Sequence, residues 1–360
     1  MKYKDNWQET RQRMNAWWKG ESMDRPMMRI VARRKEAVEP LEEVEPYANM
    51  EEKWLHPGKT VANYMNYCRQ HAFLAEGFPH FKIFMGPGAM AAYLGCKPIF
   101  GEDSVWFEKF VDDWGNNPKL DFDEDSVWFK RHYESIKEAC RLIGGDVFVD
   151  IPDIVENLDI LASMRGAENL CFDIMDNPEI VKKLVEDLDN LYFEYYDRFY
   201  DLVKTPTGES TYNGFHIWSE GKVAKLQCDF SAIISEEQYR EFVQNSIKKQ
   251  CMKLDNSLYH LDGVDAIRHL DAILEIDELD ALQWTPGAGK ADGLSEEWYP
   301  IYDKVRSAGK SLWILVSEYD SDYWVDATKR LIKRYGNDGI YIIYPDMEMD
   351  DAEKLLRNFC

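Results

Sequence analysis

The most constraining feature of this sequence is a repeated succession of a short apolar run, a turn and a stretch with helical spacing. Buried strands of a parallel sheet read as short apolar runs, because helices cover both faces of the sheet. Strands that alternate with helices in this way indicate βα units. Eight runs are predicted to be such strands: Met27–Arg33, Phe81–Met85, Asp146–Ile151, Val223–Cys228, Ser257–Leu261, Ala281–Trp284, Ser311–Val316 and Ile340–Tyr344.

Helices are expected between these strands. Pro178–Tyr200 begins with proline at a first helical position, and Ser235–Lys253 opens with Ser-Glu-Glu-Gln, the pattern of a capping box. Asp322–Tyr335 and Asp350–Phe359 are predicted to be the last two helices. Gly86–Trp114 is rich in glycine and aromatic residues and lacks a helical period, so it is predicted to be a loop.

Eight such units predict an α/β fold of the (β/α)8 TIM-barrel type, with residues 1–360 forming a single domain. We expect a helical segment over residues 1–25 and a long loop over residues 86–120, after the second strand and above the barrel mouth. A doubly wound open sheet is the alternative, but no G-x-G-x-x-G fingerprint follows the first strand.

The charge and the apolar pattern exclude several classes of partner. A formal net charge of −23 repels phosphate backbones, so nucleic acid is not an expected partner. The polar start has no signal-peptide core and no run of 18 apolar residues occurs, so no membrane span is expected. The seven cysteines lack a metal-finger spacing, which favours a cytoplasmic protein with free thiols.

Ionisable side chains follow most of the predicted strands. In a barrel the loops after the strands carry the chemistry, and ionisable groups that converge on one rim lose hydration there. Candidates at these positions are Arg33, Arg34, Asp150, Cys228, Asp229, His260, Asp262, Trp284, Glu318 and Asp346. Capping of the following helices is the alternative role for Asp229, Asp262 and Asp346.

His260 and Asp262 are the most informative pair among these candidates. Residues i and i+2 of a strand point to the same face, so both side chains can enter the barrel mouth. Imidazole nitrogen and carboxylate oxygen are zinc ligands, with Asp346, Glu318 or Cys228 as a third ligand. A hydrogen-bonded His–Asp pair without metal is the alternative. His260, Asp262, Asp229 and Glu318 are the candidate catalytic residues.

Other candidates are assigned to substrate binding. The guanidinium groups of Arg33 and Arg34 match a carboxylate or phosphate, although a surface salt bridge is an equal alternative. Asp150 is a candidate to stabilise a cationic intermediate. Trp284 would form an apolar wall, or else pack in the core, and His216 is the one further histidine retained as a candidate.

Four segments resemble the uroporphyrinogen-decarboxylase superfamily, which includes corrinoid-dependent and related methyltransferases. The resemblance extends over nearly the whole chain as a pattern of strand ends and helix starts. It is carried by Asp24-Arg25-Pro26, by Asp176-Asn177-Pro178-Glu179, by Cys228 to Ser235 followed by Tyr239-Arg240-Glu241-Phe242, and by His260-Leu-Asp-Gly263. Glu236 stands where the family has proline, and Met28–Arg34 keeps basic residues but not the decarboxylase motif Arg-Gln-Ala-Gly-Arg.

The resemblance implies a methyltransferase that moves a methyl group between a small methylated substrate and a corrinoid or other acceptor. The chain lacks an Asp-x-His-x-x-Gly module, so a separate protein would supply the corrinoid. The methyltransferase branch binds zinc through His-x-Cys and a distant Cys. Here Asp262 and Asp346 take those places, and this harder ligand set suits an oxygen-containing substrate.

Two other functions stay open at this point. One is a decarboxylase or lyase that acts on a carboxylated small molecule or tetrapyrrole, with Arg33 and Arg34 holding the carboxylates. The other is a non-catalytic binder of a corrinoid or tetrapyrrole. The resemblance also implies a homodimer.

Overall fold

A sheet dominated by parallel strands forms the centre of the fold. The computed structural model describes residues 1–360 apart from 117–119, 156 and 319. Six strands pair side by side in parallel, in the order β1-β13-β12-β11-β10-β9. Their bounds are β1 (Met27–Arg33), β9 (Val223–Leu226), β10 (Asn256–Asp262), β11 (Ala281–Thr285), β12 (Ser311–Leu315) and β13 (Ile340–Ile343).

Short strands extend the sheet beside β1 and form a second group. Strand β14 (Met347–Glu348) pairs in parallel with β1, whereas β2 (His71–Ala75) pairs with β1 in the antiparallel sense. Strand β3 (His80–Phe81) pairs in parallel with β6 (Phe148–Val149). A parallel bridge joins Ile151 to Tyr212, just after β7 (Ser210–Thr211), which forms a hairpin with β8 (Trp218–Ser219).

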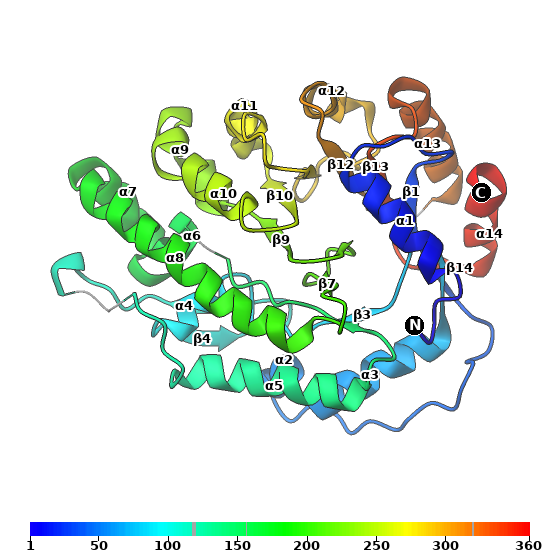
Figure 1. The fold of residues 1–360 in the computed structure, drawn as a ribbon, viewed down its shortest axis with the longest axis horizontal. Coiled ribbons are helices and arrows are strands. Elements are labelled where there is room, and N and C mark those ends of the chain that lie inside the picture. The colour runs from blue at the N-terminus through cyan, green and yellow to red at the C-terminus, as the bar shows by residue number, and fades with distance from the viewer. Residues whose placement is uncertain (117–119, 156, 319) are drawn as a thin grey trace.

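Helices lie on the outer side of the strands, as Figure 1 shows. The first half of the chain contains α1 (Trp7–Trp18), α2 (Met50–Leu55), α3 (Pro57–Gln70), α4 (Ala89–Tyr93), α5 (Val127–Ile143), α6 (Asn157–Arg165) and α7 (Ala167–Asp176). The second half contains α8 (Pro178–Val203), α9 (Glu236–Phe242), α10 (Gln244–Cys251), α11 (Leu270–Leu274), α12 (Tyr299–Ser307), α13 (Ser321–Tyr335) and α14 (Met349–Phe359).

The predicted α/β class with a parallel sheet is confirmed, and several boundaries are corrected. The expected strand Phe81–Met85 is only the two-residue β3, and β2 precedes it without having been predicted. The segment predicted as a loop holds α4 and a hairpin of β4 (Lys97–Phe100) and β5 (Val105–Glu108). Three residues of the expected loop 86–120, 117–119, lie outside the described part of the chain.

The expected helix Ser235–Lys253 is interrupted. Val243 has φ −118° and ψ −47°, which ends α9 and begins α10. The capping box at the start of α9 is present as predicted, with the Ser235 hydroxyl accepting from the backbone N–H of Gln238. The N-terminal segment expected over 1–25 is helical from Trp7 to Trp18.

The core lies between the strands and the helices. The central strands are mostly buried, and all four residues of β13 are apolar and buried. Helix α1 is attached through two indole N–H groups: Trp17 donates to Leu312 O (3.1 Å) and Trp18 donates to Trp218 O (2.9 Å).

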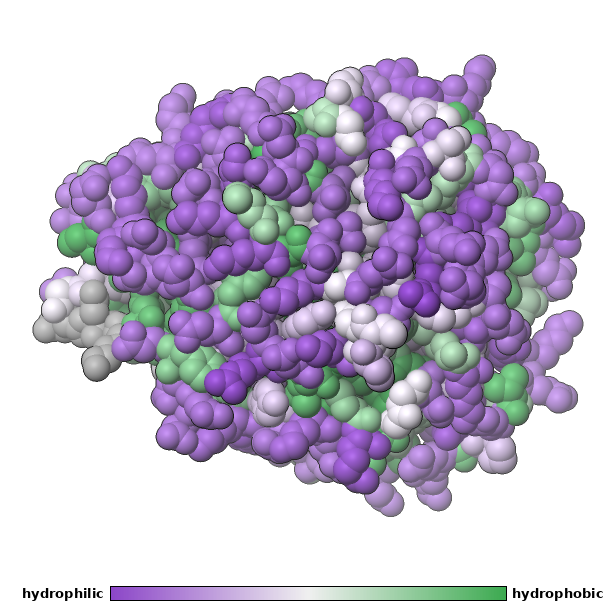
Figure 2. Space-filling model, viewed as in Figure 1, coloured by the Kyte–Doolittle hydropathy of each residue, from purple (hydrophilic) through white to green (hydrophobic). Residues whose placement is uncertain are grey.

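The face shown in Figure 2 is largely hydrophilic with scattered apolar side chains. Among the described helices, none combines the length and the apolar character that a membrane crossing requires.

Candidate metal centre and adjacent cavity

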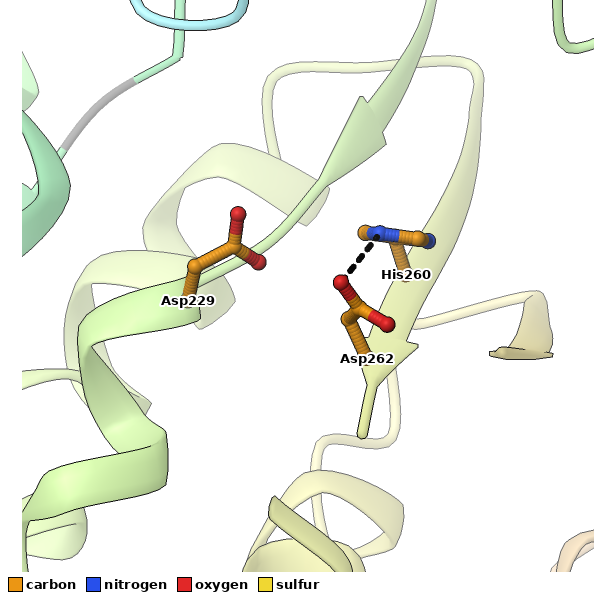
Figure 3. Close-up of side chains that lie close together, drawn as sticks. All are labelled: Asp229, His260 and Asp262. Carbon is orange, nitrogen blue, oxygen red and sulfur yellow. Dashed lines mark ion pairs between the residues drawn. The ribbon is translucent and has the colours of Figure 1, made fainter. Parts of the chain in front are cut away.

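Three ionisable side chains converge after β9 and on β10. Asp229, His260 and Asp262 each offer one ligand atom, and these atoms lie within 4.8 Å of one another. Figure 3 shows the Asp229 carboxylate, on the helical turn that follows β9, turned toward the His260–Asp262 pair on β10. His260 Nε2 lies 4.0 Å from Asp262 Oδ2. Two neighbouring parallel strands therefore bring two carboxylates and one imidazole to the same edge of the sheet.

The pleat of β10 places the pair on one face. Leu261, between His260 and Asp262, is buried on the opposite face, as alternation along a strand requires. The strand then turns at Gly263, whose φ of +79° favours glycine and whose N–H donates to Thr285 O at 2.9 Å. The turn leaves the Asp262 carboxylate at the exposed end of the strand.

A hydrogen bond fixes the orientation of the His260 ring. Its Nδ1 bonds the amide oxygen of Gln283 on the neighbouring strand β11, and Gln283 in turn donates through Nε2 to Thr285 Oγ1 at 3.0 Å. An amide oxygen only accepts, so Nδ1 carries the proton and Nε2 keeps its lone pair. His260 Nε2, which faces Asp262, is therefore free to bind a cation.

Asp229 is held by a second network. Its carboxylate accepts from Gln227 Nε2 at 2.9 Å, and its backbone N–H donates to Asp159 at 2.9 Å. Asp159 also accepts from the backbone N–H of Phe230 at 2.8 Å. Burial, followed by the charge of Asp229, raises the pKa of Asp159 to about 6. The position of Asp229 is thus set by a buried carboxyl group behind it.

The charges around the three residues favour an added cation. Loss of hydration raises the pKa of Asp229; Lys225 opposes this, and the negative charge of Asp262 adds to it. Burial, followed by the positive charge of Lys225, lowers the pKa of His260, which keeps the imidazole neutral. Lys225 itself is paired with Asp153 at 2.8 Å, so its charge is already partly compensated.

The donor set fits a divalent metal ion with open coordination positions. Catalytic zinc sites use three protein ligands and leave a fourth position for water or substrate. Asp229 and Asp262 are exposed and His260 is half-buried, so a bound ion would remain accessible. Two carboxylates with one imidazole form a harder set than one that contains thiolate.

The other predicted metal ligands lie apart from this cluster. Cys228 is buried near Tyr239 and Tyr259 rather than beside His260. Asp346 accepts from Arg29 at 2.8 Å and from the Tyr67 hydroxyl at 2.6 Å. Neither residue belongs to the group of ligand atoms around His260.

Glu318 also lies outside the group. It follows β12, and its backbone N–H donates to Asp292 Oδ2 at 3.2 Å while its carbonyl accepts from Trp324 at 2.7 Å. The metal-ligand atoms that converge in the described structure are those of Asp229, His260 and Asp262. Asp229 had been predicted only as a catalytic residue, so its place among the ligands is a change in assignment.

The structure places the predicted arginines at the end of the first strand, and it places the tryptophan in the core, which was the stated alternative to an apolar wall. Arg33 is exposed at the end of β1, and Arg34 donates through Nε to His71 O at 3.1 Å. Trp284 is buried and packs edge-on against Trp298, with ring centroids 5.3 Å apart. Trp284 alternates with Gln283 along β11, so its indole lies in the core while Gln283 reaches His260.

His80, which was not among the predicted site residues, connects Asp150 to His216 by hydrogen bonds. His80 Nδ1 bonds Asp150 Oδ2 at 2.8 Å, and His80 Nε2 bonds His216 Nδ1 at 2.6 Å. His80 and His216 line a cavity of about 540 Å³ together with Arg29. One sequence signal for Arg29 was available, because it interrupts the apolar run Met27–Ala32; in the structure it is half-buried between buried neighbours.

Comparisons with known proteins relate the chain to others through its fold. No protein-family model matches the sequence, and no curated protein matches it. A solved methyltransferase from Methanosarcina mazei superposes with a TM-score of 0.63 at 12% sequence identity, covering 97% of each chain. At this identity the likeness shows a shared fold. An HpcH/HpaI aldolase from Desulfitobacterium hafniense is 10% identical over 62% of this chain and 76% of its own, with a TM-score of 0.27, too low to indicate a shared fold.

Proposed function

We propose that this chain is a methyltransferase of the uroporphyrinogen-decarboxylase superfamily. It would transfer a methyl group between a small methylated substrate and a corrinoid on a separate protein, or another acceptor. The observation that carries the proposal is the convergence of Asp229, His260 and Asp262 at the ends of β9 and β10. The full-length superposition on a methyltransferase supports it, and it fits a barrel with its active rim at these strand ends.

Asp229, His260 and Asp262 would hold a zinc or another divalent ion. When bound, that ion supplies Lewis acidity toward an oxygen of the substrate. Gln283 fixes the His260 tautomer that presents Nε2, and Gln227 fixes the Asp229 carboxylate. Burial, and then the positive charge of Lys225, lowers the pKa of His260 and keeps its imidazole neutral, while Lys225 itself is ion-paired with Asp153. These residues arrange the ligands before any substrate arrives, which lowers the cost of reorganisation.

The first test is metal binding. We expect the purified protein to hold one divalent ion per chain by elemental analysis, and Asp262→Ala to lose it. Gln283→Leu removes only the hydrogen-bond partner of His260, and should lower metal affinity roughly 10–100-fold. Asp262→Ala removes a ligand and should lower metal affinity further. Asp265→Ala is the matched control, because Asp265 lies exposed three residues further on and should leave metal content unchanged. Equal metal content in Asp262→Ala and wild type would refute the site.

The second test is methyl transfer. In one assay, a methylated corrinoid protein is mixed with this chain and a panel of methyl acceptors. In the other, the reduced corrinoid protein is mixed with this chain and a panel of methylated donors. The cobalt absorption spectrum is followed in both. We expect a spectral change with at least one compound that disappears in Asp262→Ala. A spectrum that stays constant over a broad panel, with metal bound, would contradict methyl transfer while leaving the metal site intact.

A further inference from the structure

The cavity beside the metal centre is lined by residues from several separate segments. Arg29 comes from β1, Tyr64 and Tyr67 from α3, and His216 from the loop between β7 and β8. Its volume of about 540 Å³ lies within the 300–1,000 Å³ that is typical of small-molecule sites. Aromatic side chains make up much of the wall: Tyr47, Tyr64, Tyr67, Phe73, Phe78 and Phe81.

The charge of the cavity is opposite to that of the molecule. In a chain of net charge −23, the lining residues that the structure describes include Arg29 and Lys82 but no Asp or Glu. The Arg29 guanidinium donates to the Tyr344 carbonyl at 2.9 Å and to the Asp346 carboxylate at 2.8 Å, so its charge is partly compensated. No hydrogen bond or ion pair to the Lys82 ammonium occurs among the described residues, and a Cβ at Gly214 would lie 2.8 Å from its Nζ. Lys82 is exposed, its Nζ lies 5.0 Å from the centroid of the Phe84 ring, and the negative charges of Asp150 and Asp153 act on it at longer range. A lysine without a directly paired carboxylate, in an aromatic-walled cavity, favours a small organic anion.

A hydrogen-bonded relay ends at the same cavity. Asp150 accepts from the backbone N–H of Gly214 at 2.9 Å and from His80 Nδ1 at 2.8 Å, which fixes the proton of His80 on Nδ1. His80 Nε2 must then accept from His216 Nδ1, at 2.6 Å. The second nitrogen of His216, Nε2, consequently carries a lone pair, and it has no hydrogen-bond partner among the described residues.

The position of His216 is fixed by its backbone. Its φ of +55° is uncommon for a residue with a side chain, and the Tyr341 hydroxyl donates to its carbonyl at 3.1 Å. Such conformations persist where the surrounding structure determines them, often at functional sites. Burial, and then the positive charges of Arg29 and Lys82, lowers the pKa of His216 and keeps its imidazole neutral.

We propose that this cavity binds a small carboxylic acid with an apolar, ring-sized body and an ionisable hydroxyl, and that His216 takes the proton of that hydroxyl. The ligand O–H bond breaks and an Nε2–H bond forms on His216. The Nδ1 proton of His216 passes to His80 Nε2, so the positive charge rests on His80 beside the Asp150 carboxylate. The ligand oxygen keeps the electron pair.

The loop that brings His216 to the cavity also contacts His260 of the candidate metal centre. Phe215 lies 5.9 Å from the His260 ring by centroid distance, and the next residue, His216, lines the cavity. If the ligand of this cavity is the methyl acceptor or the demethylated product, that identification rests on the proposed function. Binding of the ligand and proton transfer to His216 do not rest on it, because they need neither a corrinoid nor methyl transfer.

The test uses 4-hydroxy-3-nitrobenzoate, whose phenolate is coloured, in a buffer acidic enough to keep the free phenol protonated. We expect saturable binding with appearance of the phenolate band. We also expect 3-nitrobenzoate to bind without that band, and the neutral 3-nitrobenzamide to bind at least about tenfold more weakly than 3-nitrobenzoate. Absence of saturable binding, or equal binding of 3-nitrobenzoate and 3-nitrobenzamide, would overturn the assignment of an anion site.

Variants separate the roles of the residues, with thermal melting used to confirm that each is folded. Lys82→Met should weaken binding of the coloured probe at least about tenfold. Lys290→Met, which removes an exposed lysine elsewhere, should not change it. His216→Gln should bind the probe but lose the phenolate band.

His80 acts through His216 as a positioning residue, so His80→Gln should reduce the phenolate fraction without abolishing binding. A phenolate band that persists unchanged in His216→Gln would refute proton transfer to His216. Unchanged binding in Lys82→Met would refute the role of its charge. Because these readouts are optical and independent of cobalt, failure here is distinguishable from failure of methyl transfer.

Discussion

At the scale of single residues, three histidines differ because of what touches their ring nitrogens. His260 bonds Gln283 and presents Nε2 toward two carboxylates, and His216 bonds His80 and presents Nε2 to a cavity. His132 is fully buried, with Nδ1 bonded to the Tyr93 hydroxyl at 2.7 Å and Nε2 to Ile83 O at 3.1 Å. Both nitrogens of His132 are satisfied, so its role is structural.

His132 should make the free energy of unfolding depend on pH. Burial lowers its pKa from 6.5 to about 4, so the native state binds a proton less readily than the unfolded chain. The stability it contributes is complete above pH 6.5 and is lost as the pH falls toward 4, by roughly 3 kcal/mol. Urea unfolding of wild type and His132→Gln over this range should show a shallower fall in the variant. Equal slopes would contradict this assignment.

At the scale of elements, helix starts were predictable and helix interruptions were not. The side-chain pattern after Ser235 identified a capping box that the structure contains. The break at Val243 has no comparable local signal, since no proline or glycine stands there. Strand β2 directly follows the last residue of α3 and was missed for the same reason. Tertiary pairing with β1 makes it a strand.

The capping box offers a test at this scale. Ser235→Ala removes the acceptor for the Gln238 N–H and should lower the free energy of unfolding by about 1 kcal/mol. Ser126 precedes α5 in the equivalent position but caps nothing through its side chain, so Ser126→Ala is the matched control. Chemical denaturation of both variants checks the difference. Equal losses would mean that the Ser235 hydroxyl does not stabilise α9.

At the scale of the whole molecule, Glu76 joins the N-terminal helix to the sheet. It is fully buried, lies 3.0 Å from Arg13 Nε and 2.7 Å from Arg25 Nη2, and accepts from the Met28 N–H at 2.8 Å. Arg13 lies on α1, and Arg25 comes just before β1. One carboxylate therefore compensates two mostly buried cations at the point where the chain enters the sheet.

Removal of this charge should destabilise the protein. Glu76→Gln leaves two guanidinium groups without their buried partner, a change that costs about 3–5 kcal/mol in such pairs. Glu353→Gln, which alters an exposed pair with Arg357 on α14, should have little effect. Thermal melting of both variants distinguishes the two cases. A melting temperature for Glu76→Gln equal to that of wild type would show that Glu76 does not hold α1 in place.

The sequence by itself determined the α/β class and most strands of the main sheet, because buried parallel strands read as short, mostly apolar runs. It also determined that His260 and Asp262 share a face, since strand alternation is a local property. Only the tertiary structure decided that Asp229 joins them and that Cys228, Glu318 and Asp346 lie elsewhere. It likewise decided that Asp150, His80 and His216 meet at one cavity. The contacts among Asp150, His80 and His216 link residues up to 136 positions apart, and they depend on strand pairing and loop paths that no local pattern encodes.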